Sequence, residues 1–303
     1  VTAVAAKLLA DGDRGPLHSF SAIGPDPETC IETRAIHSAA ALPGLAPFFV
    51  NHAELGSLQN ALADLPANGE PFDLEMPLIR AVYSVAHQHG IKIVLDGAAG
   101  DVSLTSGNRV AHHLRRGSIG SALREASDEA RFWGSGWMAW MTFAKAAWVA
   151  WMPTAIRDLR RRLLGELDDR RAGLVSTSFA KEIDLAGRRA RYRSHLAYGR
   201  MSEIDRRVET ISHPHLAAAR ERYDRVAAAV AIEPRDPFMD VRLIEFCLSL
   251  PGDQLQSDGW PKLVLRRAMR GLVPAETIWR RGKAHLGRAF IFALFESWPS
   301  WSD

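Results

Sequence analysis

Hydrophobic and polar positions alternate between two periods along the first third of the chain. Residues 1–10 (VTAVAAKLLA) have an apolar face at helical spacing, whereas 17–23 (LHSFSAI) has the composition of a β-strand. A second apolar strand is expected within 91–97 (IKIVLDG), after a helix over 81–89. Because helices and strands alternate along the chain, the pattern predicts an α/β fold with a parallel sheet over residues 1–108.

The pattern changes after residue 108. Residues 109–228 have mainly helical periodicity, with Pro153 and Pro214 as the main breaks, and residues 229–303 combine short helices with charged loops. We therefore expect one domain in three parts: an α/β part at 1–108, a large helical part, and a C-terminal part that carries most of the motifs.

Five tryptophans lie within residues 133–152, a segment that approaches the length of a bilayer span. Lys145 near its middle and the glycines at its start, Gly134 and Gly136, argue against a membrane span. The simpler interpretation is a helix whose tryptophan rings fill the core of a helical subdomain. The alternative is a docking surface for a partner or a peptide substrate.

Composition narrows the possible partners and surroundings. The 38 basic and 35 acidic side chains, with a formal net charge of +3, are too balanced to favour a nucleic acid partner. Cys30 and Cys247 are far apart in sequence and lie in apolar settings, which argues against a disulfide framework or a metal cluster. This cysteine usage is typical of the reducing cytoplasm.

The first segment with candidate chemistry is IKIVLDGAAGD at 91–101, where an apolar strand runs into a turn of small residues. Ligands of parallel α/β sheets bind beyond the carboxyl ends of the strands. There, backbone N–H groups near Gly97 could approach a phosphate while Asp96 and Asp101 hold a metal. A purely structural turn explains the same residues equally well.

Two later segments are rich in charge. A proline-containing loop at 232–251 predicts a partly buried ion network, which could be structural or chemical. Residues 280–287 (RRGKAHLG) form a basic loop that suits an anion, although a solvated turn would have the same composition. The charged residues of the first loop are Glu233, Arg235, Asp236, Asp240 and Arg242.

Together these segments resemble the C-terminal synthetase domain of the asparagine synthetase family, and the resemblance runs through nearly the whole chain. The family's glycine turn resembles VLDGAAGD at 94–101, and its acidic-Pro element resembles 70–72. The E-x-R-x-P-F-x-D motif is matched by Glu233, Arg235, Pro237, Phe238 and Asp240, the K-x-x-L-R motif by Lys262, Leu265 and Arg266, and the R-x-x-K loop by Arg280 and Lys283.

The resemblance implies an adenine nucleotide alpha hydrolase-like core with a large helical part. It also implies that a carboxylate is activated with ATP and Mg²⁺ to an acyl-adenylate, which then passes to an amine. The family's pyrophosphate loop, S-G-G-x-D-S, does not occur in the 303 residues. Because the helix at 1–10 also has no capping residue before it, we expect the first strand and this loop to precede Val1, and the chain alone to bind ATP poorly.

The resemblance also assigns roles to particular residues. Asp101 matches the aspartate associated with metal and pyrophosphate, and Lys283 matches the lysine that stabilises charge in the transition states. Positions that match nucleotide contacts are Ser21, Ala22, Asp96 and Gly97.

Two departures from the family pattern bear on the substrate. Ala98 and Val102 stand where asparagine synthetases have glutamates, which argues against aspartate and ammonia as substrates. β-Lactam synthetases instead use a Tyr–Glu pair to activate an amine within the substrate, and Tyr198 with Glu233 could be such a pair. The alternative is that Tyr198 lies on an ordinary helix while Glu233 pairs with Arg235.

The segments WRRGKAHLG and DPFMD also resemble the macrolactam cyclases of lasso peptides, which join a peptide's N-terminal amine to an Asp or Glu side chain. This resemblance implies a precursor peptide and companion maturation proteins as partners. A domain that makes asparagine from aspartate, and a catalytically inactive relative that acts as a binding subunit, remain the alternatives.

Overall fold

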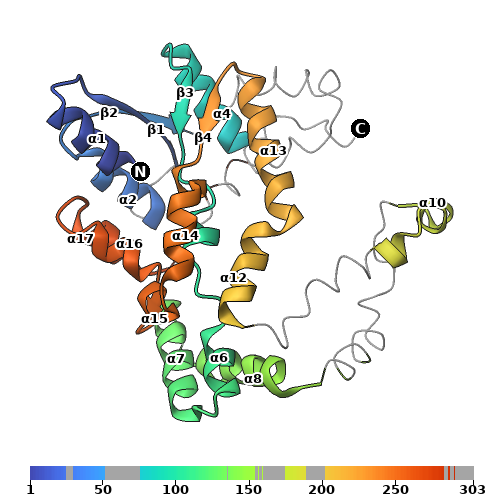
Figure 1. Cartoon of the computed structure of the whole chain (residues 1–303). Helices are drawn as coiled ribbons and strands as arrows, with labels where there is room; N and C mark the ends of the chain where they lie inside the picture. The colour runs from blue at the N-terminus through green and yellow to red at the C-terminus, as the bar shows by residue number, and fades with distance from the viewer. Residues whose placement is uncertain are drawn as a thin grey trace. The chain divides into compact units, whose positions relative to one another are not determined.

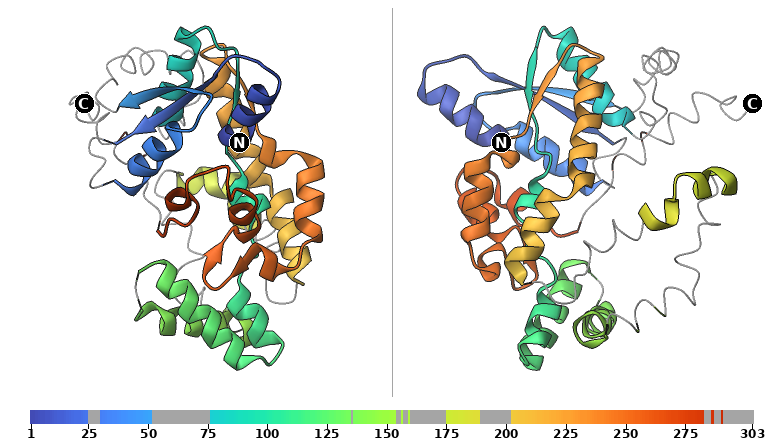
Figure 2. Two further views of the ribbon diagram at one scale, coloured as in Figure 1. Left: turned by 90° about the vertical axis from the view of Figure 1, so that its left-hand side faces the viewer. Right: turned by 45° about the vertical axis from the view of Figure 1, so that its right-hand side comes forward.

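The computed structural model describes residues 1–24, 30–51, 76–134, 136–153, 156, 159, 175–188, 202–282, 286 and 290. The chain divides into two compact units, each assembled from segments distant in sequence (Figures 1 and 2). Unit 1 comprises Val1–Leu104, Ile211–Ser249 and Lys262–Asp303, and unit 2 comprises Thr105–Thr210 and Leu250–Pro261. The three-part division expected from the sequence stays a prediction.

In the part of unit 1 that the structure describes, the strands form two parallel pairs. β1 (Leu17–Ile23) pairs with β2 (Leu45–Asn51), and β3 (Ile93–Leu95) pairs with β4 (Glu233–Arg235) (Figure 1). The α/β fold class with a parallel-sheet core is therefore confirmed. β1 has the bounds expected for LHSFSAI, whereas β3 covers only three residues of the second expected strand.

Two buried clusters join these strands to the helices of unit 1. α4 packs against β1, β2 and α13. Phe290 is fully buried with Ala22 and Val50, while Tyr83 and Val226 belong to a second cluster that links α4 and α13 to Ile232, the residue before β4. The helices are α1 (Thr2–Asp11), α2 (Ile31–Ala40), α4 (Pro77–Gln88), α5 (Gly100–Ser103), α13 (Pro214–Ala228), η4 (Pro237–Met239), α14 (Val241–Ser249), α16 (Leu263–Ala268) and α17 (Ala275–Ile278).

Unit 2 is mainly helical. α6, α7 and α8 pack on one another around Val110, Leu114 and a set of alanines that allow close helix contact (Figure 1). A short antiparallel pair, β5 (Gln256–Ser257) and β6 (Trp260–Pro261), also belongs to this unit. The helices are α6 (Arg109–Arg115), α7 (Ile119–Phe132), α8 (Met138–Trp151), α10 (Thr177–Glu182), most of α12 (Glu203–Ser212) and α15 (Gly252–Leu255).

The tryptophans around α8 are largely exposed. The residues Trp137 and Trp140 are each 71% exposed, and Trp133 and Trp151 are more than half exposed. The interpretation that these four rings fill a helical core is therefore wrong. In the cluster that joins α7 and α8 the buried residues are Ala122, Ala126 and Ala146, and Phe143 packs against them, whereas the rings of Trp140 and Trp151 stay exposed. No helix among the described residues is long and apolar enough to cross a membrane.

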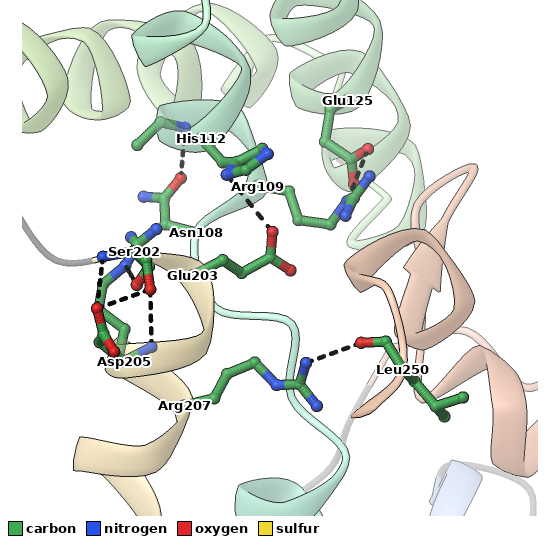
Figure 3. Close-up of polar contacts among 11 residues, drawn as sticks. Asn108, Arg109, His112, Glu125, Ser202, Glu203, Asp205, Arg207 and Leu250 are labelled. Atoms are coloured by element: carbon green, nitrogen blue, oxygen red, sulfur yellow. Dashed lines mark hydrogen bonds and ion pairs between the residues drawn. The ribbon is translucent and has the colours of Figure 1, made fainter. Parts of the chain in front are cut away.

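A polar cluster ties the helices of unit 2 to the loop that follows residue 249 (Figure 3). Burial lowers the pKa of the His112 imidazole, so this side chain is neutral at neutral pH. Three contacts join segments distant in sequence: Arg109 Nε to Glu125 Oε2 (3.6 Å), His112 Nδ1 to Glu203 Oε2 (3.4 Å), and Arg207 Nη1 to the Leu250 carbonyl oxygen (3.0 Å).

The packing of unit 2 predicts a contrast between two leucines. Leu114 is almost completely buried, whereas Leu123 is 44% exposed. We expect Leu114→Ala to lower the free energy of unfolding of unit 2 by about 2–5 kcal/mol, because it removes buried methyl groups and leaves a cavity. Leu123→Ala should change it by roughly 0.5 kcal/mol or less. Urea unfolding followed by tryptophan fluorescence measures both; equal losses would contradict this account of the core.

Candidate active site at the carboxyl ends of β3 and β4

The pairing of β3 with β4 brings two distant segments to one edge. Ile93 lies opposite Glu233 and Leu95 opposite Arg235. The ladder extends one residue further, because the Asp96 amide donates to the Arg235 carbonyl oxygen at 3.0 Å. Since parallel strands end on the same side, the residues that follow them, Asp96 and Asp236, emerge next to each other.

The turn after β3 is held by the side chain of its first residue. Asp96 Oδ1 accepts a hydrogen bond from the Ala98 amide at 2.8 Å, which closes an Asx turn. Ala99 then takes a left-handed conformation with φ of 60°, and α5 starts at Gly100. The turn predicted from the sequence therefore has a defined conformation. The side chain of Asp96 stabilises it by a hydrogen bond within the turn.

The loop with the sequence DPFMD, residues 236–240, packs directly on this turn. A Cβ atom at Gly100 would lie 3.2 Å from Cδ2 of Phe238, which is closer than ordinary carbon contacts. Gly100 is therefore needed for the close approach of the two segments. The first and the second chemistry-bearing segments predicted from the sequence thus meet in unit 1.

Four polar side chains surround the start of the turn. The Tyr83 hydroxyl donates to Asp96 Oδ2 at 3.1 Å, and Arg220 Nη1 lies 3.9 Å from the same oxygen. Arg220 also forms a close ion pair with Asp236. The side chains of Asp96, Asp236 and Arg220 are only 12–20% exposed. The guanidinium of Arg220 is 4.9 Å from the centre of the Tyr223 ring.

Burial and the adjacent carboxyl group of Asp96 raise the pKa of Asp236 to about 7, although Arg220 opposes this shift. Burial, followed by the charge of Asp96, also raises the pKa of Tyr83, so its hydroxyl stays protonated and donates. Sequence reasoning did not single out Tyr83 or Arg220. Neither lies in a recognisable motif, and only the packing of α4 and α13 brings them to Asp96.

The sequence predicted a partly buried ion network for the loop at 232–251. Of the five charged residues singled out in it, only Asp236 is in a partly buried ion pair. Glu233 and Arg235 form an exposed pair, with Arg235 Nε 2.8 Å from Glu233 Oε1. Asp240 and Arg242 form a second pair at 2.8 Å, in which Arg242 is also exposed. The pairing of Glu233 with Arg235 is the structural alternative identified from the sequence. Tyr198 lies outside the described residues, so its pairing with Glu233 stays a prediction.

Asp101, the predicted metal ligand, lies in the first turn of α5 and its side chain is 64% exposed. It forms an ion pair with Lys262, whose backbone is left-handed with φ of 56°. No group of three potential metal ligands occurs among the described side chains. A single exposed carboxylate nevertheless fits Mg²⁺ when phosphate oxygens supply further ligands.

Two of the predicted nucleotide contacts, Ser21 and Ala22, lie near the carboxyl end of β1. Ser21 lines a cavity of about 340 Å³ between β1 and β3, which α1 and α2 also border. The Ala22 side chain is buried on the side of Val50 instead. Only backbone groups of Ala22 could therefore reach a ligand, and its role as a nucleotide contact stays a prediction.

A basic cavity of about 210 Å³ lies in the C-terminal segment of unit 1, where three cationic side chains, Lys262, Arg266 and Arg280, contribute to its wall. Arg266 donates to the Ile278 carbonyl oxygen in a close hydrogen bond. Lys283 lies outside the described residues, as do Glu70, Pro71 and Phe72. The catalytic role predicted for Lys283 thus stays a prediction.

A family model described as asparagine synthase matches residues 1–291. The chain belongs to the asparagine synthase family. Asparagine synthetase [glutamine-hydrolyzing] 3 of Bacillus subtilis (strain 168) is 33% identical over 61 residues, which are 20% of this chain. The match spans 10% of the length of that relative. The family resemblance stated from the motifs is therefore confirmed.

The raised pKa of Asp236 predicts a particular pH dependence of stability. The folded state binds this proton more tightly than the unfolded state. The contribution of protonated Asp236 to the free energy of unfolding is therefore complete below about pH 4, and it disappears as the pH rises through about 7. Within this window, each unit of increase in pH lowers the free energy of unfolding by up to about 1.4 kcal/mol. Asp236→Asn should remove this slope, so that the variant gains stability relative to the wild type between pH 5 and 8.

Urea unfolding at several pH values measures the effect, and Asp240→Asn is the matched control. Asp240 lies in the same loop, but its hydrogen bonds with Arg242 lower its pKa to about 2, outside the tested range. The control should leave the slope between pH 5 and 8 unchanged. Parallel curves for the wild type and Asp236→Asn would show that Asp236 is ionised throughout.

Proposed function

We propose that this chain carries an ATP-dependent amide-forming ligase activity that proceeds through an acyl-adenylate. The observation that carries the proposal is the β3–β4 pairing, which joins the turn at 96–101 to the DPFMD loop at the carboxyl edge of parallel strands. This edge is where α/β sheets bind nucleotides, and both segments match motifs of the family.

The proposed reaction has two steps. A substrate carboxylate oxygen attacks the α-phosphorus of ATP and pyrophosphate leaves; an amine then attacks the carbonyl carbon and AMP leaves. The turn offers backbone N–H groups around Gly97 to phosphate oxygens. Lys283 stabilises the negative charge that develops in both steps. Asp101 would hold Mg²⁺, which would supply positive charge beside the phosphates, and Asp101 would then exchange its Lys262 partner for the metal.

The amine must lose a proton as the amide forms, which requires a nearby base. Glu233 is an exposed carboxylate at the start of β4, and its Arg235 partner is exposed as well. The exposure leaves Glu233 accessible to a substrate amine. Tyr198 is the second member of the proposed pair.

We further propose that the amine and the carboxylate belong to one peptide, so that the product is a macrolactam. Ala98 and Val102 replace the carboxylates expected of an enzyme that uses aspartate and ammonia. The exposed rings of Trp137 and Trp140 offer unit 2 an aromatic surface of the kind that binds peptides. A precursor peptide and companion maturation proteins would be the partners.

The test incubates the full-length gene product with ATP and candidate substrates, and follows release of pyrophosphate. A peptide that triggers release and loses one water by mass spectrometry supports cyclisation. Lys283→Ala should lower the rate about 10²–10³-fold, because a fixed positive charge is lost from the transition state. Lys7→Ala, at an exposed position of α1, is the control and should retain full activity.

Other outcomes distinguish the alternatives. Pyrophosphate release that depends on aspartate and ammonia, with formation of asparagine, would identify an asparagine-forming enzyme and contradict cyclisation. Failure of every carboxylate to trigger release, with binding of a partner protein retained, would identify a catalytically inactive binding subunit.

The aromatic surface generates a separate prediction. Trp137→Ala combined with Trp140→Ala should raise the KM for the peptide about tenfold, because each truncation removes a large apolar contact. The kcat at saturating peptide should stay within about twofold, since these rings make no contact with the reacting atoms under this proposal. Phe179→Ala, at another exposed aromatic of unit 2, is the control. An unchanged KM for the peptide would exclude this surface from substrate binding.

A further inference from the structure

Arg220 has no role in the reaction as described so far, and it lies outside the motifs that carry the family resemblance. It sits on α13, the helix that contacts both α4 and β4. Its side chain is 20% exposed, and the Tyr223 ring covers one face of its guanidinium. The position of the charge is therefore fixed by packing.

Arg220 stands between two carboxyl groups that the β3–β4 pairing forces together. It forms an ion pair with Asp236 and lies within 3.9 Å of Asp96. Both oxygens of Asp96 are already used, one by the Ala98 amide and one by Tyr83. Without the cation, these two carboxyl groups would repel each other wherever both are ionised. Such repulsion would turn Asp96 away from the Ala98 amide.

The DPFMD segment holds the turn at both of its ends. At the start, Asp236 reaches Asp96 through Arg220, and at the far end the ring of Phe238 packs on Gly100. The residues between these two points include Gly97, the residue proposed to offer its backbone N–H to phosphate. The conformation of this stretch therefore depends on contacts at each end.

We propose that Arg220 is a positioning residue: by bridging Asp236 and Asp96, it holds the turn at 96–101 in the conformation that binds nucleotide phosphate. This inference rests on the proposed function for its catalytic consequence, but its structural content can be measured without any reaction. It assigns Arg220 no contact with the substrate.

The variant Arg220→Gln tests the proposal. Arg220 lowers the pKa of Asp236, so its loss raises that pKa, and the comparison is made at pH 9, above the value of about 7 in the wild type. Amide hydrogen exchange in peptides that contain Ala98 should then become at least tenfold faster, because the repelled Asp96 no longer accepts from this amide. The KM for ATP should rise at least tenfold in pyrophosphate release, with a smaller change in kcat. Arg220→Lys keeps a charge and should show intermediate values. Arg131→Gln removes an exposed arginine of unit 2 and should behave as the wild type.

The double variant Arg220→Gln with Asp236→Asn separates positioning from general destabilisation. Removal of the second carboxylate abolishes the repulsion, so slow exchange at Ala98 and a low KM for ATP should return.

Unchanged exchange at Ala98 in Arg220→Gln, or a double variant no better than the single one, would overturn the proposal. If the wild type releases no pyrophosphate with any substrate, the proposed function fails while the exchange measurements still decide the role of Arg220. If Arg220→Gln does not fold, Arg220→Lys, alone and with Asp236→Asn, decides the question by the same exchange readout.

Discussion

Two carboxyl groups, Asp96 and Asp236, must share one half-buried position because their strands are parallel neighbours. The pairing of β3 with β4 fixes this arrangement, and the ion pair between Arg220 and Asp236 offsets the repulsion between the two carboxyl groups. The surrounding features follow from it. The Asx turn, the start of α5 and the contact of Phe238 with Gly100 all require Asp96 and the DPFMD loop to stay in place.

The rest of unit 1 supports this edge. α4 supplies Tyr83 to the turn while its other residues pack in the two buried clusters, and α13 supplies Arg220 while it packs on β4. Each polar group of the network therefore belongs to an element whose apolar face is buried nearby. A group held in this way can orient a flexible turn at little further entropic cost.

The elements predicted correctly were those whose signal is local. LHSFSAI has the composition and length of a strand, and β1 occupies those residues. β2 was not anticipated, because LAPFFVN is a continuous apolar run with no strand period. The burial of tryptophans around α8 was predicted wrongly, because a sequence of apolar residues does not reveal which face alanines will fill. The turn after β3 and the loop that contains Phe238 were located correctly, and the family that the motifs indicated is confirmed.

Arg220 and Tyr83 could not be predicted, since their function arises from contacts between α4, α13 and the strand ends. The sequence places Arg220 among many charges of an ordinary helix, and only its proximity to Asp236 distinguishes it. Lys283 and Tyr198 are the opposite case. The catalytic role of Lys283 is inferred from a motif, and that of Tyr198 from its place upstream of Glu233 in the sequence. The positions of both side chains in the site are predictions.

The activity proposed for this edge of unit 1 is activation of a carboxylate as an acyl-adenylate. It can be measured with a substrate whose carboxylate oxygens are labelled with oxygen-18, incubated with ATP and the full-length gene product. We expect one labelled oxygen in the phosphate of AMP, because the carboxylate oxygen that attacks phosphorus leaves with AMP when the amide forms. Formation of ADP and phosphate, or of AMP without label, would contradict it.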